Sequence, residues 1–169
     1  MKRINILGNS GSGKTMLARI IGERLRIPVV HLDTLFWEPG WQEADASIFR
    51  QRTAAAISGE AWVCEGNYAA KTFDLRVPQA HLNIWLDTPR LLCALRVILR
   101  STGGRNRPDL PVGCEDAKLA NTIGLVRDVW RFDAVRRGRV DAELARWTGT
   151  DTVLHLSGRQ QIARFLAGL

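Results

Sequence analysis

The sequence predicts an α/β protein in which helices cover both faces of a parallel β-sheet. Short apolar runs alternate with segments of helical periodicity along the chain, and this alternation is typical of such sheets. The apolar runs are continuous, as burial on both faces requires. A chain of 169 residues suits one domain with a sizeable core, so we expect residues 1–169 to form a single domain.

Five short apolar segments are the candidate strands. They are "RINIL" at 3–7, "VVHLD" at 29–33, "AWVCE" at 61–65, "LNIWLD" at 82–87 and "TVLHL" at 152–156. Crossovers between parallel strands are right-handed by default, which leaves few topologies for the sheet.

Helical periodicity and helix start signals separate these strands. Apolar residues recur at helical spacing before Pro28, which ends the first helix. Asp45 is a candidate N-cap, and Thr88-Pro89 has the form of a cap and a first helical position. The expected helices span 15–26, 46–58, 89–100, 115–138 and 159–166.

The segment "STGGRNRPDLPVGC", residues 101–114, interrupts this alternation. It combines glycines and prolines with Arg105 and Arg107. Because no second core follows it, we expect a mobile, lid-like loop that belongs to the one domain.

The segment "ILGNSGSGKT", residues 6–15, carries the clearest chemical signal. It follows a strand, opens a helix and has the P-loop spacing of glycine, four residues, then Gly-Lys-Thr. Glycines let backbone N–H groups turn towards phosphate, and the helix N-terminus adds partial positive charge. The motif predicts the P-loop NTPase fold, with Lys14 reaching the β- and γ-phosphates and Thr15 ligating Mg²⁺. The candidate nucleotide-binding residues of the loop are Gly8, Ser10, Gly11, Ser12, Gly13, Lys14 and Thr15.

A P-loop site also needs an acidic residue near the metal, at the end of a neighbouring strand. Glu65 ends the third predicted strand, and Gly66 after it lets the backbone turn close to a ligand. Asp87 ends the fourth strand, where an acid favours a helix start. We assign Glu65 to the metal and Asp87 to a structural cap.

The segment "HLDTLFWEPGW", residues 31–41, places an acid at a predicted strand end. There Asp33 would face the crevice where ligands bind, and could accept a proton from an attacking hydroxyl or hold the acceptor. The aromatic side chains that follow, Trp37 and Trp41 among them, could stack on an acceptor ring. Alternatively they form a small core at the sheet edge. His31 is expected only to pack within its strand.

Arginines dominate the basic charge, which is +7 overall. Arg96 and Arg100 lie four residues apart, on one face of a predicted helix that leads into the lid-like loop. They are candidates to stabilise charge on a transferring phosphoryl group. Arg131, on the helix at 115–138, is a candidate for the nucleotide. The alternative is that these side chains form a solvated helix surface.

Five segments occur in the same order in the adenylate-kinase-like proteins called DNA topology modulation proteins, which this chain resembles over nearly its whole length. They are "ILGNSGSGKT", "HLDTLFWEPGW", "EGNY", "IWLDTPR" and "VWRFDAVRR". The resemblance implies strand order 2-3-1-4-5, kinase activity and a short lid at 101–114. The family commonly has Asp-Gly-Asn-Tyr where this chain has Glu65-Gly66-Asn67-Tyr68, which keeps the charge and lengthens its reach by one methylene.

Together these features predict a kinase that uses ATP and Mg²⁺ to phosphorylate a small-molecule or nucleotide acceptor. A nucleic-acid-associated ATPase or DNA-binding protein is the alternative, raised by a pI of about 10.1 and by the name of the family. No helix-turn-helix or zinc-finger pattern accompanies it.

Further features bear on location and class. No apolar run approaches the ~20 residues of a membrane span. Three widely spaced cysteines fit reduced thiols in a cytoplasmic protein. An Asn-Lys-x-Asp stretch, expected of a guanine-specific switch, is missing from the sequence. The oligomeric state is not encoded in any pattern we find.

Overall fold

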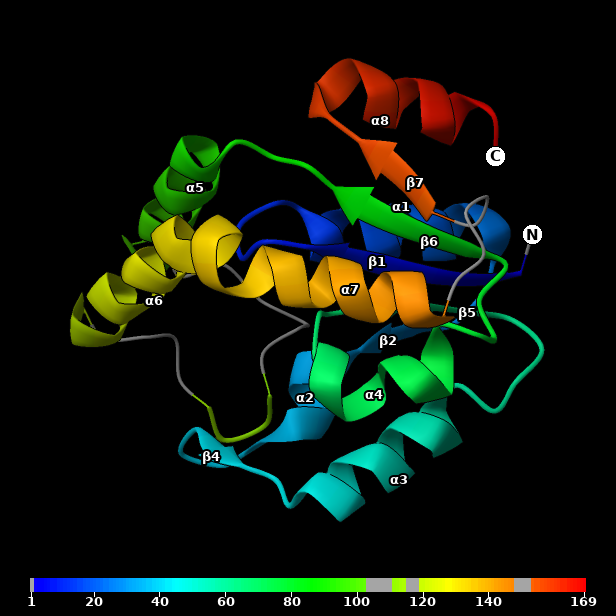
Figure 1. The fold of residues 1–169 in the computed structure, drawn as a ribbon, viewed down its shortest axis with the longest axis horizontal. Coiled ribbons are helices and arrows are strands. Elements are labelled where there is room, and N and C mark those ends of the chain that lie inside the picture. The colour runs from blue at the N-terminus through cyan, green and yellow to red at the C-terminus, as the bar shows by residue number, and fades with distance from the viewer. Residues whose placement is uncertain (1, 103–110, 115–118, 148–152) are drawn as a thin grey trace.

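The computed structural model describes residues 2–102, 111–114, 119–147 and 153–169 (Figure 1). Its main sheet is parallel and has five strands in the order β2-β5-β1-β6-β7. Counted along the chain among these five, the order is 2-3-1-4-5, which confirms the prediction. The strands are β1 (Arg3–Gly8), β2 (Val29–His31), β5 (Trp62–Glu65), β6 (Leu82–Leu86) and β7 (Val153–Leu156). A separate antiparallel pair joins β3 (Trp37–Glu38) to β4 (Gln42–Glu43).

Helices cover both faces of the sheet, as predicted. They are α1 (Lys14–Leu25), α2 (Leu32–Phe36), α3 (Ala46–Ala56), α4 (Ala69–Arg76), α5 (Arg90–Thr102), α6 (Leu119–Phe132), α7 (Gly138–Trp147) and α8 (Gly158–Ala167). A π-helical turn, η1 (Asp133–Arg137), joins α6 to α7. In the described part of the chain, no helix is both long and apolar enough to cross a membrane.

Alternating side chains of the central strands build a core on each face. Ile4 and Ile6 of β1 pack with α1 and α8 on one side. Leu7 of β1 and Trp85 of β6 pack with α4 and α7 on the other. This alternation follows from the two-residue period of a strand.

The carboxyl ends of β1, β5 and β2 meet at one edge of the sheet. Ile6 pairs with Glu65, and Glu65 pairs in turn with His31. The loops that leave these three strands are therefore neighbours, and this is the edge at which parallel α/β sheets bind ligands.

The second strand is shorter than predicted, and this moves Asp33. β2 ends at His31, and residues 32–36 form the short helix α2. Leu32 and Phe36, four residues apart, are buried on one side of this turn, so the apolar period changes from that of a strand to that of a helix. Asp33 therefore lies in a helix, and the expectation of a strand-end position is wrong.

Helix α4 has no counterpart in the sequence prediction. Its buried side chains include Thr72, Phe73 and Arg76, so a polar pair shares the inward face and weakens the apolar pattern. Two parallel strands need such a crossover between them.

Two other boundaries also differ from the prediction. The Pro89 carbonyl accepts the first helical bond of α5, from the Cys93 N–H (3.0 Å). The Thr88 hydroxyl donates to the Ser12 carbonyl (3.0 Å) and does not cap the helix. The start of the helix predicted at 115–138 lies outside the described residues, and its end differs from the prediction, because the helix continues through η1 to Trp147. Asp45 does cap α3, accepting from the Ser47 N–H (2.8 Å), as predicted.

The long helix serves two partners. Val129 of α6 packs with Cys93 and Val97 of α5, whereas Val140 and Leu144 of α7 pack on the sheet side against α4. Most of the predicted lid, residues 103–110, lies outside the described residues, so the lid remains a prediction.

Candidate active site

The loop between β1 and α1 has the backbone that the P-loop motif predicts. Gly8, Gly11 and Gly13 all have positive φ, at 141°, 78° and 106°. A Cβ on Gly11 would lie 2.4 Å from the Cys93 carbonyl oxygen, so α5 approaches the loop too closely for any side chain there. Asn9 fastens the loop to α6 by donating from its amide to the Val129 carbonyl (2.9 Å).

Lys14 lies at the first position of α1 with its ammonium group inside the loop. Its Nζ donates to the carbonyl oxygens of Gly8 (3.0 Å) and Asn9 (2.9 Å). The Ser12 N–H donates to the same Asn9 carbonyl (3.1 Å). The ammonium group that is predicted to bind phosphate is therefore held within the loop.

Thr15 and Glu65, the two predicted metal ligands, are in contact. The Thr15 hydroxyl donates to Glu65 Oε1 (3.1 Å), and the Glu65 side chain is only 5% exposed. Hydroxyl and carboxylate oxygens are donors that suit Mg²⁺, which keeps several waters and binds through one or two carboxylates together with substrate phosphates. The pair therefore fits the ion, and its metal role remains a prediction.

His31 contributes to the same cluster, which the sequence analysis did not foresee. Its Nδ1 lies 2.9 Å from Glu65 Oε1, the oxygen that also accepts from Thr15. The side chain is 13% exposed. The end of β2 therefore orients the candidate metal ligand, a relation that only the strand register reveals.

Asn67 links the turn after β5 directly to the phosphate loop. Its side-chain amide donates to the Gly8 carbonyl (2.9 Å) and accepts from the Gly8 N–H (3.1 Å). The Asn67 side chain thus makes the pair of hydrogen bonds that a neighbouring strand would make. It satisfies both the N–H and the carbonyl of Gly8, the first residue of the motif. The available signal was its place beside Glu65 and Gly66 in "EGNY".

The next residue, Tyr68, reaches the acid that was predicted to face the acceptor. Its hydroxyl donates to Asp33 Oδ1 (2.6 Å), and Asp33 itself is exposed. Burial raises the pKa of the Tyr68 phenol, and the Asp33 charge and hydrogen bond raise it further. Tyr68 therefore keeps its proton and stabilises the Asp33 carboxylate as a donor.

The aromatic residues between 36 and 49 form mainly a small core. Phe36 makes ring contacts with Trp37, Phe49 and Tyr68, and both Phe36 and Phe49 are buried. Trp41 is 36% exposed, with its ring 5.7 Å from that of Trp37. The inner rings therefore form the small core that was the alternative expectation, whereas Trp41 lies near the surface.

Among the candidate arginines, Arg96 lies against the phosphate loop. Its Nη1 donates to the carbonyls of Gly11 and Ser12, each at 3.1 Å. Arg100 follows one turn later on α5 and is partly buried, whereas Arg131 lies on the exposed side of α6. Arg96 is therefore brought to the loop by the structure, whereas Arg105 and Arg107 lie outside the described residues.

Asp87 does not cap α5. It accepts from Arg137 Nη1 (3.1 Å) across the sheet edge, so its structural role is an ion pair that ties η1 to the end of β6. The sequence predicted a structural residue here but named the wrong interaction.

No protein-family model matches this sequence, and no curated protein matches it. Solved structures do resemble it. A gluconokinase from Sinorhizobium meliloti 1021 is 17% identical with a TM-score of 0.58, over 98% of this chain and 87% of that one. A shikimate kinase from Acinetobacter baumannii, in complex with shikimate, is 21% identical with a TM-score of 0.56, over 99% of this chain and 89% of that one. At such identities the likeness speaks for architecture, and the chain has the α/β fold of P-loop kinases.

Proposed function

We propose that this protein is a Mg-ATP-dependent phosphotransferase that passes the γ-phosphate of ATP to a small acceptor. One observation carries the proposal: hydrogen bonds connect the phosphate loop to an exposed acid through two consecutive residues. Asn67 holds Gly8, and Tyr68 holds Asp33. A protein that only bound a nucleotide would have no use for the second of these contacts, between Tyr68 and an exposed acid.

The nucleotide half supplies positive charge and backbone donors. Lys14 and Arg96 lie at the loop, where they can stabilise charge on the phosphoryl oxygens. Thr15 and Glu65 would hold Mg²⁺, which when bound draws charge from the β- and γ-phosphates. Asn9 and Asn67 keep the loop in shape for this.

The acceptor half offers a carboxylate beside a phenol. Asp33 is exposed and accepts from Tyr68, so an incoming hydroxyl finds a proton acceptor close to the nucleotide edge of the sheet. Two solved structures of this fold are named as kinases, of gluconate and of shikimate. Their names support a small-molecule acceptor in preference to a macromolecule.

The test is a screen of nucleosides, nucleotides and small alcohols with γ-labelled ATP and Mg²⁺. We expect label to move to one chemical class of acceptor, and Lys14→Ala protein serves as the blank. Release of labelled phosphate to water alone, whatever acceptor is present, would indicate an ATPase instead.

Glu65→Gln is expected to raise the Mg²⁺ concentration needed for nucleotide turnover by about 10-fold or more, because a neutral amide is a weaker ligand than a carboxylate. A magnesium titration measures the shift, with Glu60→Gln, at an exposed position, as the matched control. An unchanged Mg²⁺ dependence would assign the metal to another acid, with Asp33 and Asp87 the next candidates.

The nucleic-acid alternative loses part of its support, because several arginines are used inside the fold. Arg76 is fully buried, Arg96 binds the phosphate loop and Arg137 pairs with Asp87. A salt titration of binding to duplex DNA decides the matter, since specific use of DNA predicts tight binding with a steep salt dependence.

A further inference from the structure

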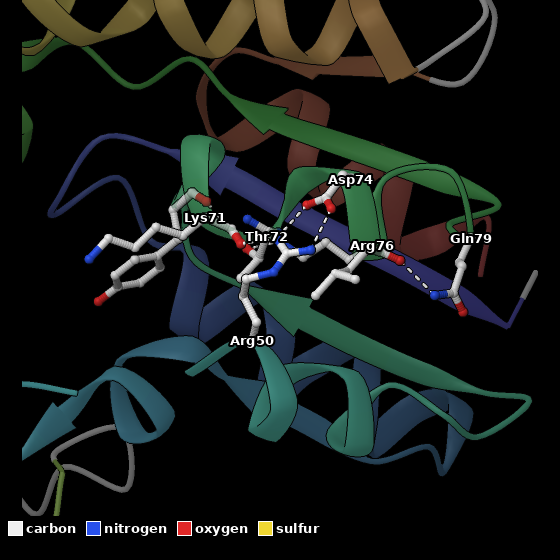
Figure 2. Close-up of polar contacts among 8 residues, drawn as sticks. Arg50, Lys71, Thr72, Asp74, Arg76 and Gln79 are labelled. Atoms are coloured by element: carbon white, nitrogen blue, oxygen red, sulfur yellow. Dashed lines mark hydrogen bonds and ion pairs between the residues drawn. The ribbon is translucent and has the colours of Figure 1, made fainter. Parts of the chain in front are cut away.

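A buried guanidinium lies behind the turn that joins the two halves of the site. Arg76 of α4 is 0% exposed. Its Nε donates to Thr72 Oγ1 (3.1 Å) and its Nη1 to Asn5 Oδ1 (3.2 Å). Its Nη2 donates to the carbonyls of both Gly66 (2.7 Å) and Asn67. Figure 2 shows Arg76 and Thr72 on the same helix.

This charge is not neutralised by a direct ion pair. Within the described residues, Arg76 forms no salt bridge, and burial lowers the pKa of its guanidinium. Burial raises the pKa of the neighbouring Cys64 thiol to about 11, so that group is neutral. An arginine nevertheless stays protonated in proteins. Carbonyl, amide and hydroxyl oxygens bind the buried charge, and the nearby Glu65 carboxylate stabilises it without a direct contact.

The turn that Arg76 grips has an unusual backbone. Gly66 has φ of 129°, and Tyr68, which is not a glycine, has φ of 40°. A left-handed conformation at an aromatic residue is costly and persists only where surrounding contacts impose it. Arg76 binds the carbonyls on both sides of Asn67, so it fixes the two peptide groups that set the direction of the Asn67 and Tyr68 side chains.

We propose that Arg76 is a positioning residue for the proposed phosphotransfer, on which this inference rests. Its guanidinium holds the turn at 66–68 so that Asn67 clamps Gly8 of the phosphate loop and Tyr68 meets Asp33. One side chain thereby sets the nucleotide half and the acceptor half relative to each other. It touches neither nucleotide nor acceptor.

Arg76→Lys tests this, because a lysine has one nitrogen and cannot span Asn5, Thr72 and the turn at once. We expect hydrogen exchange at the Gly8 amide, followed by NMR, to quicken about 10- to 100-fold, the factor expected when local opening loses the support of one hydrogen bond from a charged group. Exchange at Ile21, which is buried in α1 on the other face of the sheet, should not change. Affinity for a non-hydrolysable ATP analogue with Mg²⁺ should weaken together with the change at Gly8.

Arg50→Lys is the matched control. Arg50 of α3 also donates to α4, at the Lys71 carbonyl (2.6 Å), and pairs with Asp74 (Figure 2), but the bonds shown do not involve the turn. It should leave exchange at Gly8 unchanged. Equal acceleration at Gly8 and Ile21 in the Arg76 variant, or the same effect from Arg50→Lys, would show a purely structural role and overturn the proposal.

Two further variants keep the test decisive. If Arg76→Lys does not fold, Thr72→Val removes the hydroxyl that accepts from Nε and donates to the Tyr68 carbonyl (3.3 Å). This milder loss at the same turn must still quicken exchange selectively at Gly8. With Asn67→Ala in place, Arg76→Lys should weaken analogue binding little further; full additivity would contradict transmission through Asn67. The exchange readout needs no turnover, so it can fail while the kinase assignment stands, and the reverse also holds.

Discussion

Lys14→Ala protein is expected to lose nucleotide binding and turnover while remaining folded. Each charge-assisted bond from the ammonium to phosphate is worth about 10- to 100-fold in affinity, and the transferring phosphoryl group would lose the cation that the phosphate loop supplies. The fold should survive, because among the described residues the Lys14 ammonium bonds only to two carbonyls of its own loop. Calorimetric titration with Mg-ATP and thermal unfolding measure the two properties separately.

Lys2→Ala provides the comparison, since Lys2 is exposed at the opposite end of β1. It should bind nucleotide as the unmodified chain does. If Lys14→Ala protein still binds Mg-ATP with unchanged affinity and turns it over normally, the phosphate-loop assignment is wrong, and the kinase proposal fails with it.

Asp33→Asn is expected to lower phosphate transfer by roughly 10²–10⁴, the range for losing a general base, with ATP affinity near its original value. The asparagine oxygen can still accept from the Tyr68 hydroxyl, so the local geometry should persist while the proton acceptor is lost. The measurement is paired: calorimetry for nucleotide affinity, and label transfer to the acceptor found in the screen.

Asp128→Asn, at an exposed site on α6 that pairs with Arg136, is the control for loss of a carboxylate. Equal weakening of ATP binding and turnover by Asp33→Asn would place Asp33 in the metal site. No change in either quantity would make Asp33 structural, and the kinase proposal would then rest on the phosphate loop and the fold alone.

The sequence was most informative where one short segment carries both structure and chemistry. The phosphate loop could be predicted because its glycines, lysine and threonine are contiguous and their backbone geometry depends on local residues. Strand order followed from the resemblance to a known group and not from the pattern of apolar runs. Glu65 was found because it ends a strand, and strand ends gather at one edge in a parallel sheet.

The remainder of the candidate site depends on relations between distant segments. Asn67 and Gly8 are 59 positions apart, and nothing in either segment alone indicates that they meet. Arg76 lies on a helix that the prediction missed, because Thr72 and Arg76 interrupt its apolar face. The predicted second strand was two residues too long and therefore included Asp33. A buried Leu32 fits a strand and the first turn of a helix equally well.

The π-helical turn η1 rotates the buried face of α7 about the helix axis relative to the buried face of α6. A π-turn holds one residue more than the α-helical repeat, and each residue turns an α-helix by about 100°. Loss of a single residue from Asp133–Arg137 would therefore leave the helix intact but rotate Val140 and Leu144 away from α4 while Val129 still faced α5. An insertion or deletion here would therefore change the orientation of α7 on the sheet relative to α6, which contacts the nucleotide loop through Asn9.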